Sequence, residues 1–368
     1  MITVLAVVGT RPEVIKMAPV VCELRQVPAR ARTILCSTGQ QRELVDQTLA
    51  IFDLRPEVAL DLMEPDQPLA RLTARLFQHL DPVIRDTKPD WVIAQGDTTS
   101  VMVTALTAFY RRVPFGHVEA GLRTGDLARP FPEEANRTIA DRVATALFAP
   151  TDRARRNLIG EGVPPSAIHV TGNTVIDALL SIARRSYYWA SGPLAHVPRD
   201  RRLVLVTAHR RESFGDDLRR QCRAIRELAA RFKADTHFVW PVHPNPNVVG
   251  PVRSALAGAE NISLIEPLDY VAQVHLMRRC ALILTDSGGI QEEAPTFSVP
   301  VLVLRDKTER PEGIEAGVAL LTGSDPDRIV SEATRLLADP AAHHAMASGV
   351  NPYGDGQAAA RIVRTLVP

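Results

Sequence analysis

The sequence predicts an α/β protein made of two doubly wound domains, each with a parallel sheet covered by helices. The chain has 368 residues, more than the roughly 100–200 residues of a typical domain. Short β-branched runs alternate with amphipathic stretches along almost the whole chain, which is typical of parallel sheets with helical crossovers. The same rhythm restarts after a polar, Pro- and Arg-rich gap at residues 191–202. Together these observations predict two Rossmann-like domains.

The first domain is predicted to contain six strands with helices between them. The strand-like runs occupy residues 3–8, 33–37, 91–95, 114–118, 146–149 and 168–171. A helical pattern at residues 173–185 could close this domain or open the next one. We place the boundary near residue 172, so that the first domain covers residues 1–172.

The second domain is predicted to cover residues 173–354. Its strand-like runs occupy residues 203–207, 236–242, 262–265, 281–285, 300–304 and 318–321. An amphipathic pattern at residues 356–366 follows a Pro-Tyr-Gly turn. We therefore expect residues 355–368 to contain a C-terminal helix that packs back on the first domain.

Composition and length of apolar stretches exclude several classes of protein. Hydrophobic residues make up 45%, charged residues 23%, and the net charge is +1, which argues against disorder and against a nucleic-acid partner. The longest apolar stretches fall far short of the ~18–20 residues that cross a bilayer. No basic flank precedes the first apolar run, so no signal peptide is expected. The expected location is cytoplasmic, without membrane contact.

The cysteines and glycines carry no metal or dinucleotide pattern. Cys22, Cys36, Cys222 and Cys280 lie far apart and form no C-x-x-C pair, which favours reduced thiols over a zinc site. Neither G-x-G-x-x-G nor a Walker A motif occurs. The sequence therefore predicts no metal and no cofactor.

Polar residues directly after predicted strands are the first candidates for function, because open parallel sheets bind ligands at the carboxyl ends of their strands. The first strand leads through Gly9 and Thr10 into a helix that carries Arg11 and Lys16. Backbone amides, the helix dipole and two cations would favour an anion there. An ordinary turn with a solvated Arg and Lys is the alternative.

Three carboxylates follow neighbouring strands of the first domain. Asp97 ends the strand at 91–95, Glu119 ends the next one, and Glu133 begins a helix after a proline turn. We interpret the adjacent Glu134 as a partner of the helix dipole. Burial and mutual repulsion can separate the pKa values of clustered carboxylates. The pattern therefore predicts proton-transfer chemistry.

The second domain places two histidines at successive strand ends. His209 and Arg210 follow the strand at 203–207, and His243 follows the strand at 236–242. Histidines at neighbouring strand ends face the same crevice, and His209 with Arg210 suits a diphosphate.

A glycine turn in the second domain predicts a nucleotide-diphosphate site. Ser287, Gly288 and Gly289 open a helix in which Glu293 follows one turn later. Glycines let backbone amides approach a phosphate, and a carboxylate can accept both ribose hydroxyls. The loop at 305–312, which includes Arg310, adds cations to the same edge. A tight turn with dipole-favoured acids, and a plain surface loop, are the alternatives.

Taken in order, these segments resemble the non-hydrolysing UDP-N-acetylglucosamine 2-epimerases, which share the two-domain GT-B architecture of certain glycosyltransferases. The resemblance covers nearly the whole chain. It rests on Val8-Gly9-Thr10-Arg11-Pro12-Glu13, Gln95-Gly96-Asp97-Thr98-Thr99, residues 117–124, Pro132-Glu133-Glu134-Ala135-Asn136-Arg137, Thr171-Gly172-Asn173-Thr174, His209-Arg210-Arg211-Glu212, Pro241-Val242-His243, residues 286–293 and Thr308-Glu309-Arg310-Pro311-Glu312.

The resemblance implies roles for these residues. Asp97, Glu119 and Glu133 match the family's acid/base carboxylates, and His209 matches its catalytic histidine. It further implies a cytoplasmic homodimer without cofactor, two domains that face a central cleft, and elimination of UDP to a 2-acetamidoglucal followed by readdition. The residues that match the family's nucleotide-sugar contacts are Arg11, Lys16, His243, Ser287, Gly288, Glu293 and Arg310. Arg210 after its strand and Gly289 in the glycine turn are further candidates for substrate binding.

Two departures from the family pattern concern its second, activating UDP-GlcNAc site. Gln41 stands after Gln40 where many bacterial members have a histidine, and Asp66 stands before Gln67 where they have an arginine. Loss of a cation weakens anion binding. We expect weakened or absent activation by substrate.

Other functions remain open on the sequence. A hydrolysing epimerase would release ManNAc and UDP. The resemblance argues against this function, because those enzymes tend to carry a serine-rich stretch where this chain has Asp286-Ser287-Gly288-Gly289. A glycosyltransferase has no evident use for three clustered carboxylates, and a nucleotide-sugar sensor would not need them. The sugar could also be a UDP-2,3-diacetamido uronic acid.

Overall fold

The computed structural model describes residues 1–40, 42–64, 66–210 and 213–368. It divides the chain into two compact units. The first consists of Met1–Ala178 with Tyr353–Pro368, and the second of Leu179–Pro352. The chain therefore passes between the units twice, once within helix α7 (Thr174–Ala183) and once after Pro352.

The first unit is built on a seven-stranded sheet in the order β3-β2-β1-β4-β5-β6-β7, with all neighbouring strands parallel. Six of its strands were predicted from the sequence. The two-residue strand β3 was not, because so short a run carries no periodicity. The strands are β1 (Ile2–Val8), β2 (Ala31–Ser37), β3 (Val58–Ala59), β4 (Trp91–Gln95), β5 (Phe115–Val118), β6 (Ala146–Ala149) and β7 (Ile168–Val170).

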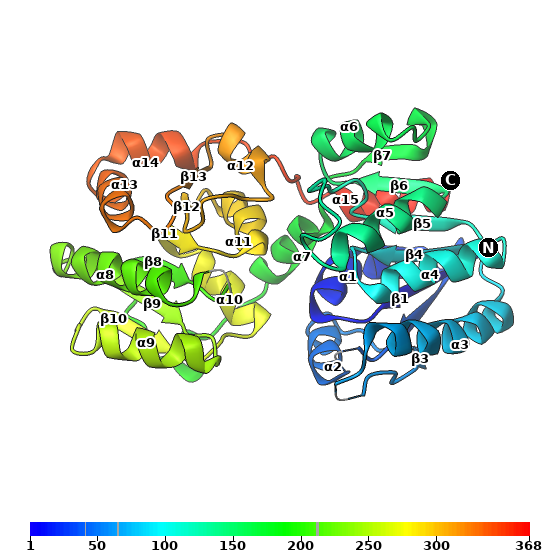
Figure 1. Cartoon of the computed structure of the whole chain (residues 1–368), viewed down its shortest axis with the longest axis horizontal. Coiled ribbons are helices and arrows are strands. Elements are labelled where there is room, and N and C mark those ends of the chain that lie inside the picture. The colour runs from blue at the N-terminus through cyan, green and yellow to red at the C-terminus, as the bar shows by residue number, and fades with distance from the viewer. Residues whose placement is uncertain (41, 65, 211–212) are drawn as a thin grey trace. The chain divides into compact units, whose positions relative to one another are not determined.

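Helices cover both faces of this sheet (Figure 1). The C-terminal helix packs against α1, and the carboxylate of Asp177 accepts hydrogen bonds from the amides of Ala358 and Ala359 at its start. The helices are α1 (Arg11–Arg25), α2 (Arg42–Ile51), α3 (Leu69–Thr87), α4 (Thr99–Tyr110), α5 (Glu133–Val143), α6 (Asp152–Gly160), the short η1 (Pro165–Ala167) and α15 (Ala358–Leu366).

The second unit has a six-stranded parallel sheet in the order β10-β9-β8-β11-β12-β13. Its core includes the fully buried Phe238 and Trp240 together with residues of α8 and α13. The strands are β8 (Arg202–Thr207), β9 (Thr236–Pro241), β10 (Ile262–Ile265), β11 (Cys280–Thr285), β12 (Val301–Val303) and β13 (Ala319–Leu321). The helices are η2 (Trp189–Ser191), α8 (Asp216–Arg231), α9 (Pro246–Leu256), α10 (Tyr270–Met277), α11 (Gly288–Glu293), η4 (Ala294–Phe297), α12 (Pro311–Glu315), α13 (Pro326–Ala338) and α14 (Pro340–Ala347).

The predicted α/β class with two parallel sheets is confirmed. In each sheet the strand order reverses once, between β1 and β4 in the first unit and between β8 and β11 in the second. Ligands of such sheets bind beyond the carboxyl ends of the strands at these switch points. None of the described helices is long and apolar enough to span a membrane.

Candidate active site

Asp97 and Glu119 lie at the carboxyl ends of the neighbouring strands β4 and β5 in the first unit. The backbone is in the left-handed region at Gly96, directly before Asp97, with φ +92°. It is in the same region at Glu119 itself, with φ +67°. Each carboxylate is paired with a cation, Asp97 with Arg137 at 2.5 Å and Glu119 with Lys16. The turns therefore place two ion-paired carboxylates at the sheet edge where ligands bind.

Three side chains hydrogen-bond the nearly buried carboxylate of Glu119. Lys16 and Asn173 donate to Oε1, the latter at 2.9 Å, and Gln95 donates to Oε2. The sequence predicted Lys16 as a diphosphate contact, and the structure gives it Glu119 as a partner. Arg11, the other cation predicted for this turn, is the first residue of α1 and is partly exposed.

The electrostatic surroundings of Asp97 include the other two predicted carboxylates. Burial raises the pKa of Asp97, Arg137 and Lys16 act against this, and Glu119 and Glu133 raise the pKa further. Glu133, the first residue of α5, is partly buried. The structure thus brings Asp97, Glu119 and Glu133 close enough to influence one another, as expected of an acid/base group.

Helix α5 also supplies contacts that the sequence reasoning missed. Asn136 donates to the carbonyl of Asp97, in addition to the Arg137 ion pair. Glu134 is only 2% exposed and accepts hydrogen bonds from the amides of Thr124 and Gly125. The interpretation of Glu134 as a mere dipole partner is therefore wrong, because it holds the loop before α5. Its burial could not be read from the sequence.

Glu13 is a further carboxyl that the sequence did not single out. It is 2% exposed and accepts hydrogen bonds from the amides of Gly9 and Thr10 and from the hydroxyl of Thr98. Burial raises the pKa of Glu13 to about 7, against the effect of these hydrogen bonds and with a contribution from Asp97. The glycine at position 9 is required by packing, since a Cβ there would lie 2.4 Å from Oγ1 of Thr38.

A buried ion pair supports the turns that carry Asp97 and Glu119. His117 on β5 hydrogen-bonds the carbonyl of Gly96 at 2.8 Å through Nε2 and Asp141 at 2.5 Å through Nδ1. A carbonyl only accepts, so Nε2 carries a proton. Asp141 also accepts from the amide of Gly121 and pairs with Arg123. The pair thus links the turn before Asp97 to the turn after Glu119.

In the second unit, Asp286 organises the end of β8. Its fully buried carboxylate accepts hydrogen bonds from the amides of His209 and Arg210, each at 2.7 Å, and lies 3.2 Å from Nδ1 of His209. The rings of His209 and His243 stack with centroids 5.8 Å apart. Burial lowers the pKa of His209, Asp286 opposes this, and Arg210 and His243 add to it. The structure therefore brings the two predicted histidines together.

The glycine turn after β11 has free space beside its backbone, where side chains at Gly288 and Gly289 would lie. Neither Gly288 nor Gly289 has a positive φ, and a Cβ at either position would meet no atom closer than 3.5 Å. The nearest atom to a Cβ at Gly288 is Cζ of Arg310. Nε of Arg310 donates a hydrogen bond to Glu292 at 2.6 Å. Because neither backbone conformation nor packing demands glycine here, the free space fits a ligand that approaches the amides.

The remaining predicted contacts of this unit lie on the same elements. Ser287 precedes α11 and its amide donates to Oγ1 of Thr285. Glu293, at the end of α11, is buried and accepts a hydrogen bond from the hydroxyl of Tyr270 at 3.1 Å. Because Tyr270 is the first residue of α10, this hydrogen bond fixes the orientation of the Glu293 carboxylate relative to that helix.

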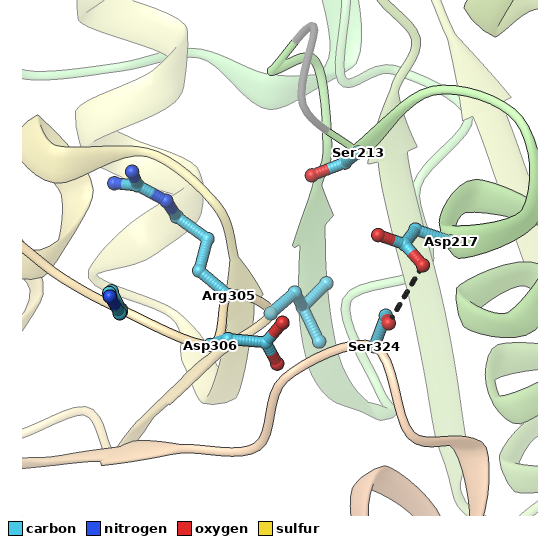
Figure 2. Close-up of a pocket in the computed structure, with 7 residues that line it drawn as sticks. Ser213, Asp217, Arg305, Asp306 and Ser324 are labelled. Atoms are coloured by element: carbon cyan, nitrogen blue, oxygen red, sulfur yellow. Dashed lines mark hydrogen bonds between the residues drawn. The ribbon is translucent and has the colours of Figure 1, made fainter. Parts of the chain in front are cut away.

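A pocket of about 370 Å³ lies at the same edge of the second sheet, after β12 and β13. The loop that follows β12 contributes Arg305, Asp306 and Lys307 to it, whereas Arg310 of the same loop lies at Gly288. Among the residues that line this pocket, Ser324 donates a hydrogen bond to Asp217 at 3.0 Å (Figure 2). The predicted cationic loop is thus split between this pocket and the glycine turn.

The positions expected to form a weakened activating site lie in the first unit. Gln40 accepts a hydrogen bond from Ser100 at 3.0 Å, and Gln67 accepts one from the amide of Glu64. Asp66 is exposed, with φ +51°. Gln41 lies outside the described residues. Ser100 also contacts Thr38, so Gln40 is connected to the residues that pack on the Gly9 turn.

Comparison with known proteins assigns the family. A family model described as UDP-N-acetylglucosamine 2-epimerase matches residues 23–367. The "Probable UDP-N-acetylglucosamine 2-epimerase" of Ralstonia nicotianae is 51% identical over 99% of this chain and 98% of its own. The UDP-N-acetylglucosamine 2-epimerase of Escherichia coli K12 is 49% identical over the same shares. A crystal structure of the Neisseria meningitidis UDP-GlcNAc 2-epimerase bound to UDP-GlcNAc is 42% identical, with a TM-score of 0.89 over 99% of both chains. The chain therefore belongs to the UDP-N-acetylglucosamine 2-epimerase family, whose members are isomerases.

Proposed function

We propose that the protein catalyses the reversible epimerisation of UDP-GlcNAc to UDP-ManNAc at C2, by elimination of UDP and its readdition to a 2-acetamidoglucal. The observation that carries this proposal is the pair of ion-paired carboxylates, Asp97 and Glu119, at adjacent strand ends. Two carboxylates with different surroundings can serve as acid and base on opposite faces of one carbon. The Neisseria relative, solved with UDP-GlcNAc, supports the choice of substrate.

The chemistry explains why UDP must leave. The C2 hydrogen of UDP-GlcNAc is not next to a carbonyl, so its direct removal would be very unfavourable. Breaking the bond between C1 and the phosphate oxygen gives C1 oxocarbenium character and makes the C2 proton acidic. A base then takes that proton and the C1–C2 double bond forms. In the return step a proton reaches the other face of C2 and a β-phosphate oxygen of UDP attacks C1.

The carboxylates of the first unit are proposed to move these protons. Burial and the neighbouring Glu119 and Glu133 raise the pKa of Asp97, which favours proton uptake from C2 near neutral pH. Glu119 and Glu133 are proposed to supply the proton on the other face and to stabilise positive charge at C1. Lys16 lies against Glu119, so it is placed to compensate charge as the proton moves.

The second unit is proposed to hold UDP and stabilise it as it leaves. His209, Arg210 and Arg310 would face the diphosphate, together with Arg11 of the first unit, and the amides of Gly288 and Gly289 would approach a phosphate. The hydroxyl of Ser287 would contact the same group. Glu293, oriented by Tyr270, would accept the ribose hydroxyls, and His243 would stack beside His209.

The proposal requires that the glucal stay bound and that water be kept away from it. Water would otherwise attack C1 and release free sugar. The same requirement separates the epimerase from a hydrolysing enzyme.

Product analysis tests the proposal. The purified protein is incubated with UDP-GlcNAc, and UDP-ManNAc, UDP and free ManNAc are separated by chromatography over time. We expect UDP-ManNAc to reach an equilibrium with UDP-GlcNAc and free UDP to stay low. Free ManNAc in step with UDP would contradict the proposal, and no turnover would direct the search to a UDP-2,3-diacetamido uronic acid.

We also propose that the protein forms a homodimer through the first unit. Phe109 and Tyr110 at the end of α4 are 55% and 68% exposed, and the ring of Tyr110 stacks on Phe77 of α3. Exposed aromatic clusters are typical of protein interfaces. Sedimentation velocity should give a dimer, and Tyr110→Asp should shift it to monomer. A wild-type monomer at micromolar concentration would contradict this.

A further inference from the structure

The motif Thr171-Gly172-Asn173-Thr174 lies where the chain leaves the first unit. Asn173 directly precedes α7, and its amide donates to the carbonyl of Tyr353, on the returning segment, at 2.7 Å. Gly172 and Gly354 have φ +87° and +143°, and a Cβ on Gly172 would lie 3.3 Å from Cα of Gly354. The outgoing and returning segments are thus tied together at Asn173.

The side chain of Asn173 has a fixed orientation. It is 3% exposed, and its Oδ1 accepts a hydrogen bond from the amide of Val175 at 3.1 Å, in the first turn of α7. Because an amide nitrogen cannot accept from an N–H, the atom that faces Val175 must be the oxygen. The Nδ2 group therefore faces Glu119 and donates to its Oε1 at 2.9 Å.

Glu119 receives hydrogen bonds from three different elements. Lys16 lies on α1, Gln95 ends β4, and Asn173 precedes α7. The first two belong to the sheet and helix frame of the unit. Of these three donors, Asn173 is the one that directly precedes α7, the helix within which the chain passes from the first unit to the second.

We propose that Asn173 is a positioning residue that couples the carboxylate of Glu119 to the joint between the units. A shift of the first turn of α7 would displace the Asn173 side-chain amide and with it the orientation of Glu119. The inference rests on the proposed function, in which Glu119 acts on the sugar. In this role Asn173 orients Glu119 and does not itself act on the sugar.

Two substitutions separate this role from helix capping. Asn173→Ser keeps an oxygen that can cap α7, since Ser is a favoured N-cap, but it is too short to reach Glu119. Asn173→Ala removes both contacts. We expect kcat to fall about 10²-fold in both variants, the loss that a misplaced catalytic group can cause. KM for UDP-GlcNAc should stay close to that of the wild type, and only the Ala variant should melt at a clearly lower temperature.

Asn261→Ser is the matched control. Asn261 is also 3% exposed and donates to the carbonyls of Ala229 and Thr236 in the second unit. It should lose stability and keep the wild-type kcat. If Asn173→Ser has the wild-type kcat while Asn173→Ala does not, the residue only caps α7 and the inference is overturned. If wild-type protein fails to epimerise UDP-GlcNAc in the same assay, the proposed function fails, and the inference with it.

Discussion

Arg137 on α5 donates a hydrogen bond to the carboxylate of Asp97 at the end of β4, over 2.5 Å. The guanidinium is largely buried, so the ion pair is shielded from solvent. Burial raises the pKa of Asp97 and Arg137 opposes this. The contact therefore fixes the direction of the carboxylate while leaving it able to take up a proton.

Asp97→Asn should lower kcat by roughly 10²–10⁴-fold, the usual effect of removing a general acid or base. The amide has the same shape and can still accept from Arg137, so the variant should fold normally. Steady-state conversion of UDP-GlcNAc measures the effect. Asp86→Asn, on the exposed end of α3, is the control and should keep full activity. Near-normal turnover of Asp97→Asn would remove Asp97 from the mechanism.

Glu13→Gln should make the protein more stable than wild type at alkaline pH. Burial raises the pKa of Glu13 from 4.5 to about 7. A raised carboxyl pKa means that the folded state binds the proton more tightly, so stability is lost as pH rises from 4.5 through 7. The loss amounts to about 3 kcal/mol. Urea unfolding at pH 5 and pH 8 checks this. Equal stabilities of the two proteins at pH 8 would contradict it.

Asp141→Asn should lower the free energy of unfolding by about 3 kcal/mol, since it breaks a buried ion pair. Burial would lower the pKa of His117, but Asp141 holds it raised. Burial would raise the pKa of Asp141, but His117 and Arg123 hold it lowered.

The pH dependence of this difference follows from the two directions. The contribution of His117 to the free energy of unfolding is present below pH 6.5 and is lost as pH rises through its folded pKa. The contribution of Asp141 is present above pH 3.8 and is lost as pH falls through its folded pKa. The variant should therefore differ most from wild type between these two values. A difference that does not change with pH, measured by urea unfolding, would show that the pair is not ionised.

Gly289→Ala should weaken UDP binding at least about tenfold without loss of stability, as expected for a methyl group that keeps a phosphate from the amides. A Cβ at this position would meet only Oγ of Ser287, at 4.0 Å. Calorimetric titration with UDP and a melting curve measure both effects. Gly160→Ala, at the open end of α6, should leave UDP affinity unchanged. Unchanged affinity of Gly289→Ala would exclude the turn from the UDP site.

The enzyme should follow a hyperbolic rate curve with UDP-GlcNAc. The resemblance implies a histidine and an arginine where this chain has Gln41 and Asp66, and Asp66 is exposed, so we expect a second anionic ligand to gain little there. UDP-ManNAc should then be converted without added UDP-GlcNAc. Initial rates over a wide substrate range test this. A sigmoidal curve with a lag on UDP-ManNAc would show that activation is retained.

The sequence allowed the sheets and the strand-end residues to be predicted because both are local. Periodicity located twelve strands, and parallel pairing alone brings Asp97 beside Glu119. The supporting contacts join distant positions, as Asp286 does with His209 and Asn173 with Glu119. Burial decides their roles, and it arises only when the chain is folded. For the same reason Glu134 was interpreted only as a partner of the helix dipole, and Glu13 was not singled out.

Proton NMR of the purified protein with UDP-GlcNAc in D₂O shows whether the C2 hydrogen exchanges with solvent during the reaction. Reversible elimination predicts that deuterium enters C2 of both UDP-GlcNAc and UDP-ManNAc while free UDP stays low. Formation of UDP-ManNAc with the C2 hydrogen retained from the substrate would contradict proton exchange through Asp97 and its neighbours.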